Sequence, residues 1–459
     1  MTGPDEVTEN GATAFPADPA AVLRLHAVTE TQTRTGICHH PITVTGTTLL
    51  VEVGTGRILD RSEPGASAVR CRNRRAAMCP SCSALYRLDA FHLIAAGLRG
   101  GKDTPAQVAG HPRLLLTLTA PSFGAVHTGP TSGGLARPCH PGVCGASHLP
   151  SDPVIGAAID PNRYDYIGQV LFNAHAGVLW ARFTLLARRE LAAAIGLGRA
   201  EAARRVRIVF AKVTEFQTRG VVHVHAVVRL DGPGGPADAP PVWATMRLLR
   251  TVLRRAARKT RMTVPGSRLS AARTLAWGRQ IDITPITATE STEATVARYV
   301  AKYATKSTEA AGIDIPPISC RICTGAGVTQ SRLCRACGGT GRRSGVRLGH
   351  LTEHVNALVE TCWRLGGQPA YAGLGLRRWA HQLGFHGHFA TKSRSYSTTF
   401  AALRAERRVH AINLWRHRLG IDPAVSLDVV GDWHYTGRDL TVTPATPAAS
   451  DDTGTGHGR

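Results

Sequence analysis

Apolar residues along this chain fall either into short continuous runs, typical of buried strands, or into longer stretches with helical spacing. Strands are predicted over 114–119, 206–216 and 222–229, with a further strand near 279–283. The second and third of these strands flank Gly220, a residue suited to a tight turn, and therefore predict a hairpin.

Helical spacing predicts helices over 83–98, 165–195 and a basic segment at 241–260. Another helix is predicted to begin near Thr292, a residue type that caps helices, and 351–435 reads as mostly helical and basic. Small polar residues with Pro and Gly dominate both ends of the sequence, and these ends are predicted to be disordered tails.

Length and charge narrow the class of protein. The 459 residues are too many for one core and indicate two to four domains. Lys+Arg 55 against Asp+Glu 32 gives +23, which favours a polyanionic partner but also fits a merely basic surface. We expect no membrane span, because no run of about 18 apolar residues occurs. We also expect the N-terminal stretch not to be a signal peptide, because it carries acids and prolines and has no basic segment followed by an apolar one. The 11 cysteines then indicate reduced thiols and metal ligands in the cytoplasm.

The helix after Thr292 carries a stripe of phenol and ammonium groups. Its members recur at i, i+3, i+4 and i+7, on one helical face: Tyr299, Lys302, Tyr303 and Lys306. A tyrosine pair at this spacing is usually half-buried packing, but Val296, Val300 and Ala304 provide another face for the core. The intervening lysines favour an anionic ligand, so both tyrosines are candidate nucleophiles.

His223 and His225 alternate along a predicted strand and therefore point to the same face. Glu215 and Gln217 have the same parity on the preceding strand. If the loop around Gly220 has an odd number of residues, we expect Gln217 to face His223 and Glu215 to face His225. Either side chain could complete a divalent metal site; Glu215 is favoured because a carboxylate suits Mg²⁺ or Mn²⁺ better than an amide. The alternative is ordinary polar alternation on a solvated strand.

Three segments in this order resemble the motifs of HUH endonucleases: Leu116-Thr-Leu-Thr-Ala-Pro121, His223-Val-His225 and Tyr299-Val-Ala-Lys-Tyr303. More narrowly, the chain resembles two-tyrosine rolling-circle replication initiators of actinobacterial plasmids and integrative elements. Further matches lie at Cys79-Pro-Ser-Cys82, Phe172-Asn-Ala-His175, Trp379-Ala-His-Gln-Leu-Gly384 and Thr391-Lys-Ser-Arg-Ser-Tyr-Ser-Thr398.

The resemblance implies an α+β fold, with a central antiparallel sheet flanked by helices in an RRM-like nuclease core. It also implies an activity. One tyrosine attacks the scissile phosphate of origin DNA and forms a 5′-phosphotyrosine, and the freed 3′ hydroxyl primes leading-strand synthesis. The second tyrosine serves termination and religation. Host helicase and polymerase are the implied partners. Lys302 beside the tyrosines favours phenolate, and a metal on the histidines polarises the phosphate.

Two C-x-x-C-x-G-x-G knuckles predict one structural Zn²⁺ on Cys320, Cys323, Cys334 and Cys337, and the pattern looks like the zinc repeat of DnaJ-type chaperones. Arginines flanking these knuckles are predicted to contact DNA: Arg321, Arg332, Arg335, Arg342 and Arg343. Cys79 and Cys82 form half of a second candidate zinc site, for which Cys38, Cys71 and His39 are the candidate partners.

Cys139, Cys144 and His148 are also close in sequence. In the family that the chain resembles, a Cys-Pro-x-Cys pair tends to precede Tyr-Asp-Tyr. Here Asp160-Pro-Asn-Arg163 stands in its place, which argues against a zinc site at 139–163.

Three other functions compete with an origin-nicking initiator. A relaxase or transposase would use the same chemistry on other DNA, whereas a zinc-containing DNA-binding regulator would bind DNA without catalysing a reaction. A chaperone cofactor would account only for the zinc repeat.

The predicted organisation has six segments. They are a tail (1–22), a cysteine-containing region (23–105), the nuclease core (106–312), the zinc module (313–345), a helical basic region (346–438) and a second tail (439–459).

Overall fold

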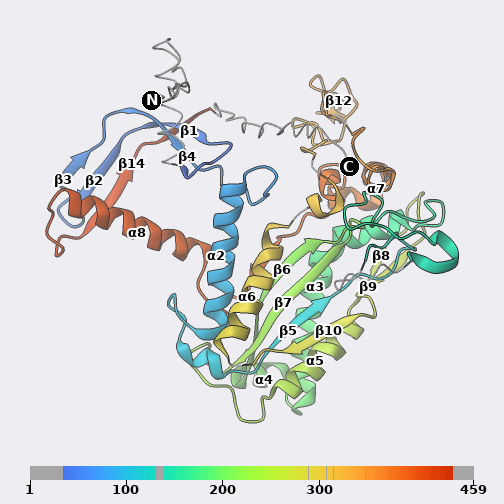
Figure 1. Cartoon of the computed structure of the whole chain (residues 1–459), viewed down its shortest axis with the longest axis horizontal. Coiled ribbons are helices and arrows are strands. Elements are labelled where there is room, and N and C mark those ends of the chain that lie inside the picture. The colour runs from blue at the N-terminus through green and yellow to red at the C-terminus, as the bar shows by residue number, and fades with distance from the viewer. Residues whose placement is uncertain are drawn as a thin grey trace, which may run out of the picture. The chain divides into compact units, whose positions relative to one another are not determined.

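The structure is a computed structural model that describes residues 35–130, 138–287, 289–306, 308–313, 315–346 and 348–437. The predicted disordered tails, 1–22 and 439–459, lie outside these residues. The chain forms two compact units (Figure 1). The described residues up to Ser83 and from His410 make the small unit, and Ala84–Val409 make the large unit. The boundaries between the units in the sequence fall within two helices, α2 (Pro80–Arg99) and α8 (Phe400–Arg418).

The small unit pairs strands from both ends of the chain. In one sheet β1 (Ile42–Gly46) lies between β4 (Gly65–Val69) and β15 (His434–Gly437). In the other, β2 (Thr48–Glu52) lies between β3 (Ile58–Arg61) and β14 (Leu427–Gly431). The prediction of a helical region reaching to 435 is therefore wrong for its last residues. Short strands of this kind depend on distant partners, which local propensity cannot reveal.

The large unit is built on an antiparallel five-stranded sheet with the order β10-β5-β7-β6-β13. Its strands are β10 (Ile281–Pro285), β5 (Arg113–Leu118), β7 (Val222–Asp231), β6 (Arg207–Phe216) and β13 (Ala390–Lys392). The predicted strands at 114–119, 206–216, 222–229 and 279–283 all belong to this sheet, and the mixed α/β fold with an antiparallel sheet is confirmed.

Helices cover both faces of this sheet (Figure 1). On one face the apolar side chains of β5 and β7 pack with α3 (Tyr166–Ala194) and α5 (Met246–Lys259). On the other face β6 and β7 pack with α2 and α6 (Glu290–Thr305). Successive side chains of each strand thus point into two different cores. His223 and His225 lie on the second face, which α6 covers.

Shorter elements complete the large unit. They are η1 (Ala106–Gly110), η2 (His140–Cys144), α4 (Arg199–Arg205), β8 (Arg261–Val264), β9 (Arg273–Ala276), η3 (Thr308–Ala311), β11 (Val328–Thr329), β12 (Arg332–Leu333), α7 (Glu353–Leu365), η4 (Pro369–Leu374) and η5 (Ala380–Gln382).

Among the described residues, α3 alone is long and apolar enough to cross a membrane. Its side chains Leu171, Phe172 and Leu179 are fully buried in the core beneath the sheet. The apolar character of α3 is accounted for by this packing, as expected for the core helix of a globular unit.

Two fully buried arginines lie side by side on the second face of the sheet, where Arg113 of β5 pairs with Arg229 of β7. Arg113 forms an ion pair with Glu293 of α6 and donates to the Leu98 carbonyl at the end of α2. Arg229 binds Asp231 at 2.6 and 2.9 Å and donates to the Gly97 carbonyl. The last turn of α2 and the first turns of α6 are thereby fixed to the sheet.

We expect Glu293→Gln to destabilise the large unit by about 3–5 kcal/mol, because it leaves the buried Arg113 without a counter-charge. The free energy of opening of the β5 and β7 amides, measured by native-state hydrogen exchange, tests this. The matched control is Glu406→Gln, which removes an exposed ion pair to Lys102 at 2.5 Å and should cost at most about 1 kcal/mol. Equal effects of the two substitutions would contradict the assignment.

Candidate active site and cysteine clusters

The hairpin of β6 and β7 brings Glu215, His223 and His225 together. Glu215 pairs directly with His223, and Val213 pairs with His225. The predicted register, in which Gln217 faces His223, is therefore wrong by two residues. The reason is the turn, which Gln217 and Val221 close by a backbone hydrogen bond of 2.9 Å. Gln217 instead accepts a hydrogen bond from Arg219 Nε at 3.1 Å.

The carboxylate and the two imidazoles form a compact buried group. Their candidate ligand atoms lie within 4.8 Å of one another, and His225 Nε2 is 3.1 Å from Glu215 Oε1. Glu215 Oε2 and His223 Nδ1 are buried and have no hydrogen-bond partner in the described part of the chain, although Lys306 Nζ approaches Oε2 to 3.4 Å. Burial, reinforced by His225, lowers the pKa of His223 to about 4. A neutral imidazole, a carboxylate and unpaired acceptor atoms fit a divalent cation.

Thr117 on the neighbouring strand orients one of these imidazoles. It pairs with His225 across β5 and β7, and its Oγ1 lies 3.2 Å from His225 Nδ1. A hydroxyl that accepts from Nδ1–H places the lone pair of the imidazole on Nε2, beside Glu215, where it could bind a metal shared with that carboxylate. The sequence placed Thr117 in a strand, but its role depends on the pairing of that strand with β7.

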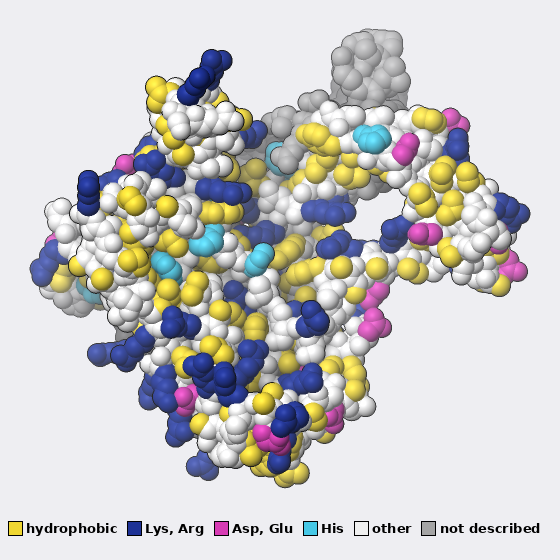
Figure 2. Space-filling view, turned by 180° about the vertical axis from the view of Figure 1, so that it is seen from behind, with side chains coloured by type: hydrophobic (Ala, Val, Ile, Leu, Met, Phe, Trp, Pro, Cys, Tyr) yellow, Lys and Arg dark blue, Asp and Glu magenta, His cyan; other side chains and the backbone are white. Residues whose placement is uncertain are grey.

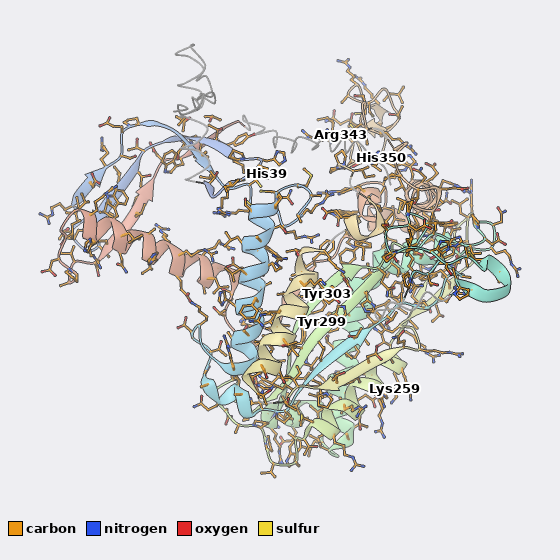
Figure 3. The ribbon with its side chains drawn as sticks, viewed as in Figure 1. His39, Lys259, Tyr299, Tyr303, Arg343 and His350 are labelled. Carbon is orange, nitrogen blue, oxygen red and sulfur yellow. The ribbon has the colours of Figure 1, made fainter. Side chains whose placement is uncertain are left out.

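Tyr299 and Tyr303 project from α6 toward β7, one turn apart (Figure 3). The ring of Tyr303 stacks on His225 with centroids 4.4 Å apart, and the ring of Tyr299 meets His225 edge-on at 5.5 Å. Val300 and Ala304 are buried on the other side of α6, and Val296 is partly buried, as predicted. The helix therefore uses its apolar side for packing and directs both phenols to the metal-type group.

The two tyrosines have different environments. The side chain of Tyr299 is 41% exposed, whereas Tyr303 is half-buried. Burial, together with a hydrogen bond and charge interaction from Tyr299, raises the pKa of Tyr303 well above its usual value. The cation placed against Tyr303 is Lys306, whose Nζ lies 4.8 Å from the ring centroid, while the predicted partner Lys302 is exposed to solvent.

Asn173 of α3 holds the turn that leads into the histidine strand. Its Nδ2 donates to the Gly220 carbonyl at 2.9 Å, and its Oδ1 accepts from Val222 N at 3.0 Å. The carbonyl of Arg219 receives Gln169 Nε2 at 2.7 Å and lies 3.2 Å from His354 Nε2. Asn173 belongs to one of the motifs noted in the sequence, but only the structure assigns it this supporting role.

The four cysteines of the predicted zinc module converge. Cys320 and Cys334 sulfurs lie 3.9 Å apart, and those of Cys323 and Cys337 lie 3.7 Å apart. Backbone amides in both knuckles donate to sulfur, Gly327 N to Cys323 at 3.3 Å and Gly341 N to Cys337 at 3.2 Å. Four sulfurs within 4.8 Å of one another can hold a tetrahedral zinc ion.

The cysteines near the N-terminus form a second group of the same kind. Cys38, Cys71, Cys79 and Cys82 all lie within 4.8 Å of one another, with sulfur separations of 3.7 to 3.8 Å. The structure thus brings Cys38 and Cys71 to the Cys-Pro-Ser-Cys pair, and four sulfurs are present without His39. This group too can hold zinc.

The arginines of the zinc module have unequal surroundings. Arg342 pairs with Glu360 of α7 at 2.6 Å and lies 4.5 Å above the Trp363 ring, so it docks the module onto α7. Arg343 donates to the Pro317 carbonyl at 3.4 Å. Arg321, Arg332 and Arg335 are exposed. The prediction that the module contacts DNA therefore concerns the arginines that do not hold the module against α7, above all the exposed Arg321, Arg332 and Arg335.

The described part of this basic chain thus contains a buried carboxylate with two histidines, two tyrosines whose rings contact one of these histidines, and clustered cysteines that could hold zinc. Comparison with known proteins identifies the family. The family model described as "Replication initiator protein, pSAM2" matches residues 24–449. The chain belongs to this family of replication initiators.

A relative from Streptomyces ambofaciens, named "Replication initiator protein", is 43% identical over 433 residues, which cover 91% of this chain and 87% of that protein. No solved structure matches this chain. The resemblance to a replication initiator is therefore confirmed at the level of the family.

We expect Cys323→Ser to remove one equivalent of zinc, because an incomplete set of thiolates cannot hold the ion in a neutral buffer containing a chelator. Elemental analysis of the purified chain measures this. The matched control is Cys362→Ala, a buried cysteine of α7 outside the four-cysteine groups, which should leave the zinc content unchanged. Unchanged zinc in Cys323→Ser would contradict a site at these cysteines.

Proposed function

We propose that this initiator nicks one strand of its origin by tyrosine transesterification, in the manner of a two-tyrosine HUH nuclease. The observation that carries the proposal is the contact of both tyrosine rings with His225, a member of the Glu215, His223 and His225 group. A strand-borne metal-type group directly beneath two phenols is the arrangement needed to bring a phosphate between a nucleophile and a Lewis acid.

The reaction exchanges one phosphate ester for another. The Oη of a tyrosine forms a bond to the scissile phosphorus as the bond from phosphorus to O3′ breaks. The phenol proton passes to solvent, and the departing O3′ takes up a proton to become the 3′ hydroxyl that primes synthesis. The strand remains joined to the chain through a 5′-phosphotyrosine, so the reverse reaction reseals DNA without a nucleotide cofactor.

The site residues divide the work of this reaction. Glu215, His223 and His225 would hold Mg²⁺ or Mn²⁺, which supplies Lewis-acid polarisation of the phosphate. Thr117 keeps His225 oriented. Lys306, placed against Tyr303 and Glu215, offsets negative charge as it develops on phosphate oxygens.

The different environments of the tyrosines support an order of action. Tyr299 is the more exposed and is therefore the more accessible to incoming DNA. Tyr303 is stacked on His225, and its raised pKa disfavours phenolate until an anion or a metal changes its surroundings. We assign initiation to Tyr299 and the later resealing step to Tyr303.

The proposed partner is origin DNA in the cytoplasm, with host helicase and polymerase following the nick. α5 supplies a basic surface on the opposite face of the sheet from the tyrosines (Figure 2). It has no acidic residue, and its cations are Arg247, Arg250, Arg254, Arg255, Arg258 and Lys259. Duplex flanking the nick site could bind there through phosphate contacts.

We expect Tyr299→Phe to lose most covalent capture of single-stranded origin DNA, and the double variant with Tyr303→Phe to lose all of it. Tyr303→Phe alone should still nick but fail in strand transfer and resealing. Adduct yields by denaturing gel, with the linked residue mapped by mass spectrometry, test this assignment. The control is Tyr435→Phe, an exposed tyrosine of the small unit. DNA binding without any adduct in the wild-type chain would instead favour a non-enzymatic regulator.

We expect Thr117→Val to lower the affinity for Mn²⁺ about 10-fold or more, because it removes the oriented hydroxyl from His225 while conserving shape. Titration of Mn²⁺ against nicking rate should show activity restored at high metal concentration. Thr284→Val is the matched control, since Thr284 lies on the adjacent strand β10 and is exposed. An unchanged Mn²⁺ requirement in Thr117→Val would remove Thr117 from the site.

A further inference from the structure

A third group of metal-type ligands lies in the loop between β5 and α3. It consists of two imidazoles and two thiols whose donor atoms all lie within 4.8 Å of one another: His127, Cys139, Cys144 and His148. The sequence argued against a site at 139–163 because the expected Cys-Pro-x-Cys pair is missing there. His127 lies upstream of that interval, and the fold brings it to the other three side chains.

The separations of these atoms match a tetrahedral zinc site. Zinc–nitrogen and zinc–sulfur bonds of about 2.0–2.1 and 2.3 Å place tetrahedral ligands about 3.4 Å apart for two nitrogens and about 3.6 Å apart for nitrogen and sulfur. His127 Nδ1 lies 3.1 Å from His148 Nε2. Cys144 Sγ lies 3.5 Å from His148 Nε2, and Cys139 Sγ lies 3.9 Å from His127 Nδ1.

The surroundings of the group orient its members. His148 Nδ1 lies 2.9 Å from Asp152 Oδ2, so the carboxylate can accept a hydrogen bond from Nδ1–H, which leaves the Nε2 lone pair directed at the other ligands. Asp152 is itself fixed, because its Oδ1 accepts from Val154 N at 3.0 Å. Cys139 Sγ accepts from Thr128 N at 3.3 Å, as thiolates in zinc sites do. The carboxylate–histidine arrangement with two thiols is a built coordination shell rather than incidental packing.

We propose that His127, Cys139, Cys144 and His148 bind a structural zinc ion. With all four positions filled by protein ligands, the site is closed and leaves no coordination position for a substrate. It is distinct from both four-cysteine groups, and it does not depend on the proposed nicking reaction.

This ion would brace the turn that precedes the active-site histidines. The backbone of His127 pairs with the next part of the loop, donating to the Ala157 carbonyl at 2.9 Å and accepting from Gly156 N at 2.8 Å. Gly156 packs directly on the β6–β7 turn, where an added Cβ would lie 2.6 Å from the Thr218 carbonyl carbon. Zinc on His127 therefore fixes the loop segment that covers the start of the His223 strand.

The test is zinc content per chain in the full-length protein after dialysis against a weak chelator. Cys139→Ser and Cys144→Ser should each lose one equivalent relative to wild type, and Cys362→Ala should lose none. The readout is a difference, so it stands whatever the two four-cysteine groups contain. His127→Cys keeps a zinc-binding donor and should retain the ion, with stronger thiolate-to-metal absorption after cobalt substitution.

Retention of full zinc content by both serine variants would overturn the proposal. So would unchanged cobalt absorption in a folded His127→Cys variant, because a new thiolate in the coordination shell must add intensity. Zinc loss in the serine variants together with enhanced cobalt absorption in His127→Cys would establish the site. His127→Cys controls for misfolding of Cys139→Ser and Cys144→Ser, because it retains four zinc ligands.

Discussion

The large unit depends on two buried ion pairs on one face of its sheet. Arg113 and Arg229 are neighbours in register and would be strongly destabilising if left without partners. Glu293 and Asp231 supply the counter-charges, and two carbonyls at the end of α2 accept further hydrogen bonds from the arginines. Because Glu293 belongs to α6, the same pairing sets where that helix lies along the sheet, and with it the height of both tyrosines above His225.

Sequence patterns predicted the local elements of the large unit well and their connections less well. Apolar alternation located β5, β6, β7 and β10, since each strand carries its own periodic signal. The register of β6 and β7 was shifted by two residues, because it is set by turn geometry rather than by side-chain pattern. β14 and β15 were missed, since their partners lie more than 350 residues away in the chain.

In the candidate site, too, the sequence predicted local features better than contacts between elements. His223, His225, Tyr299 and Tyr303 could be chosen because spacing alone puts each pair on one face. Residues that act across elements left no such signal. Thr117 matters through its pairing with β7, and His127 through a loop that folds back on itself.

The small unit pairs strands from early and late parts of the chain, so its two sheets can be completed only late in synthesis. Ala84–Val409 contains every strand of the five-stranded sheet, so the large unit can fold as soon as it leaves the ribosome. β1 and β2 are synthesised earlier, but they can pair with β15 and β14 only after those strands have been synthesised. Cys38, Cys71, Cys79 and Cys82 are all present in that early segment, so a zinc ion can hold it in a compact form through the delay.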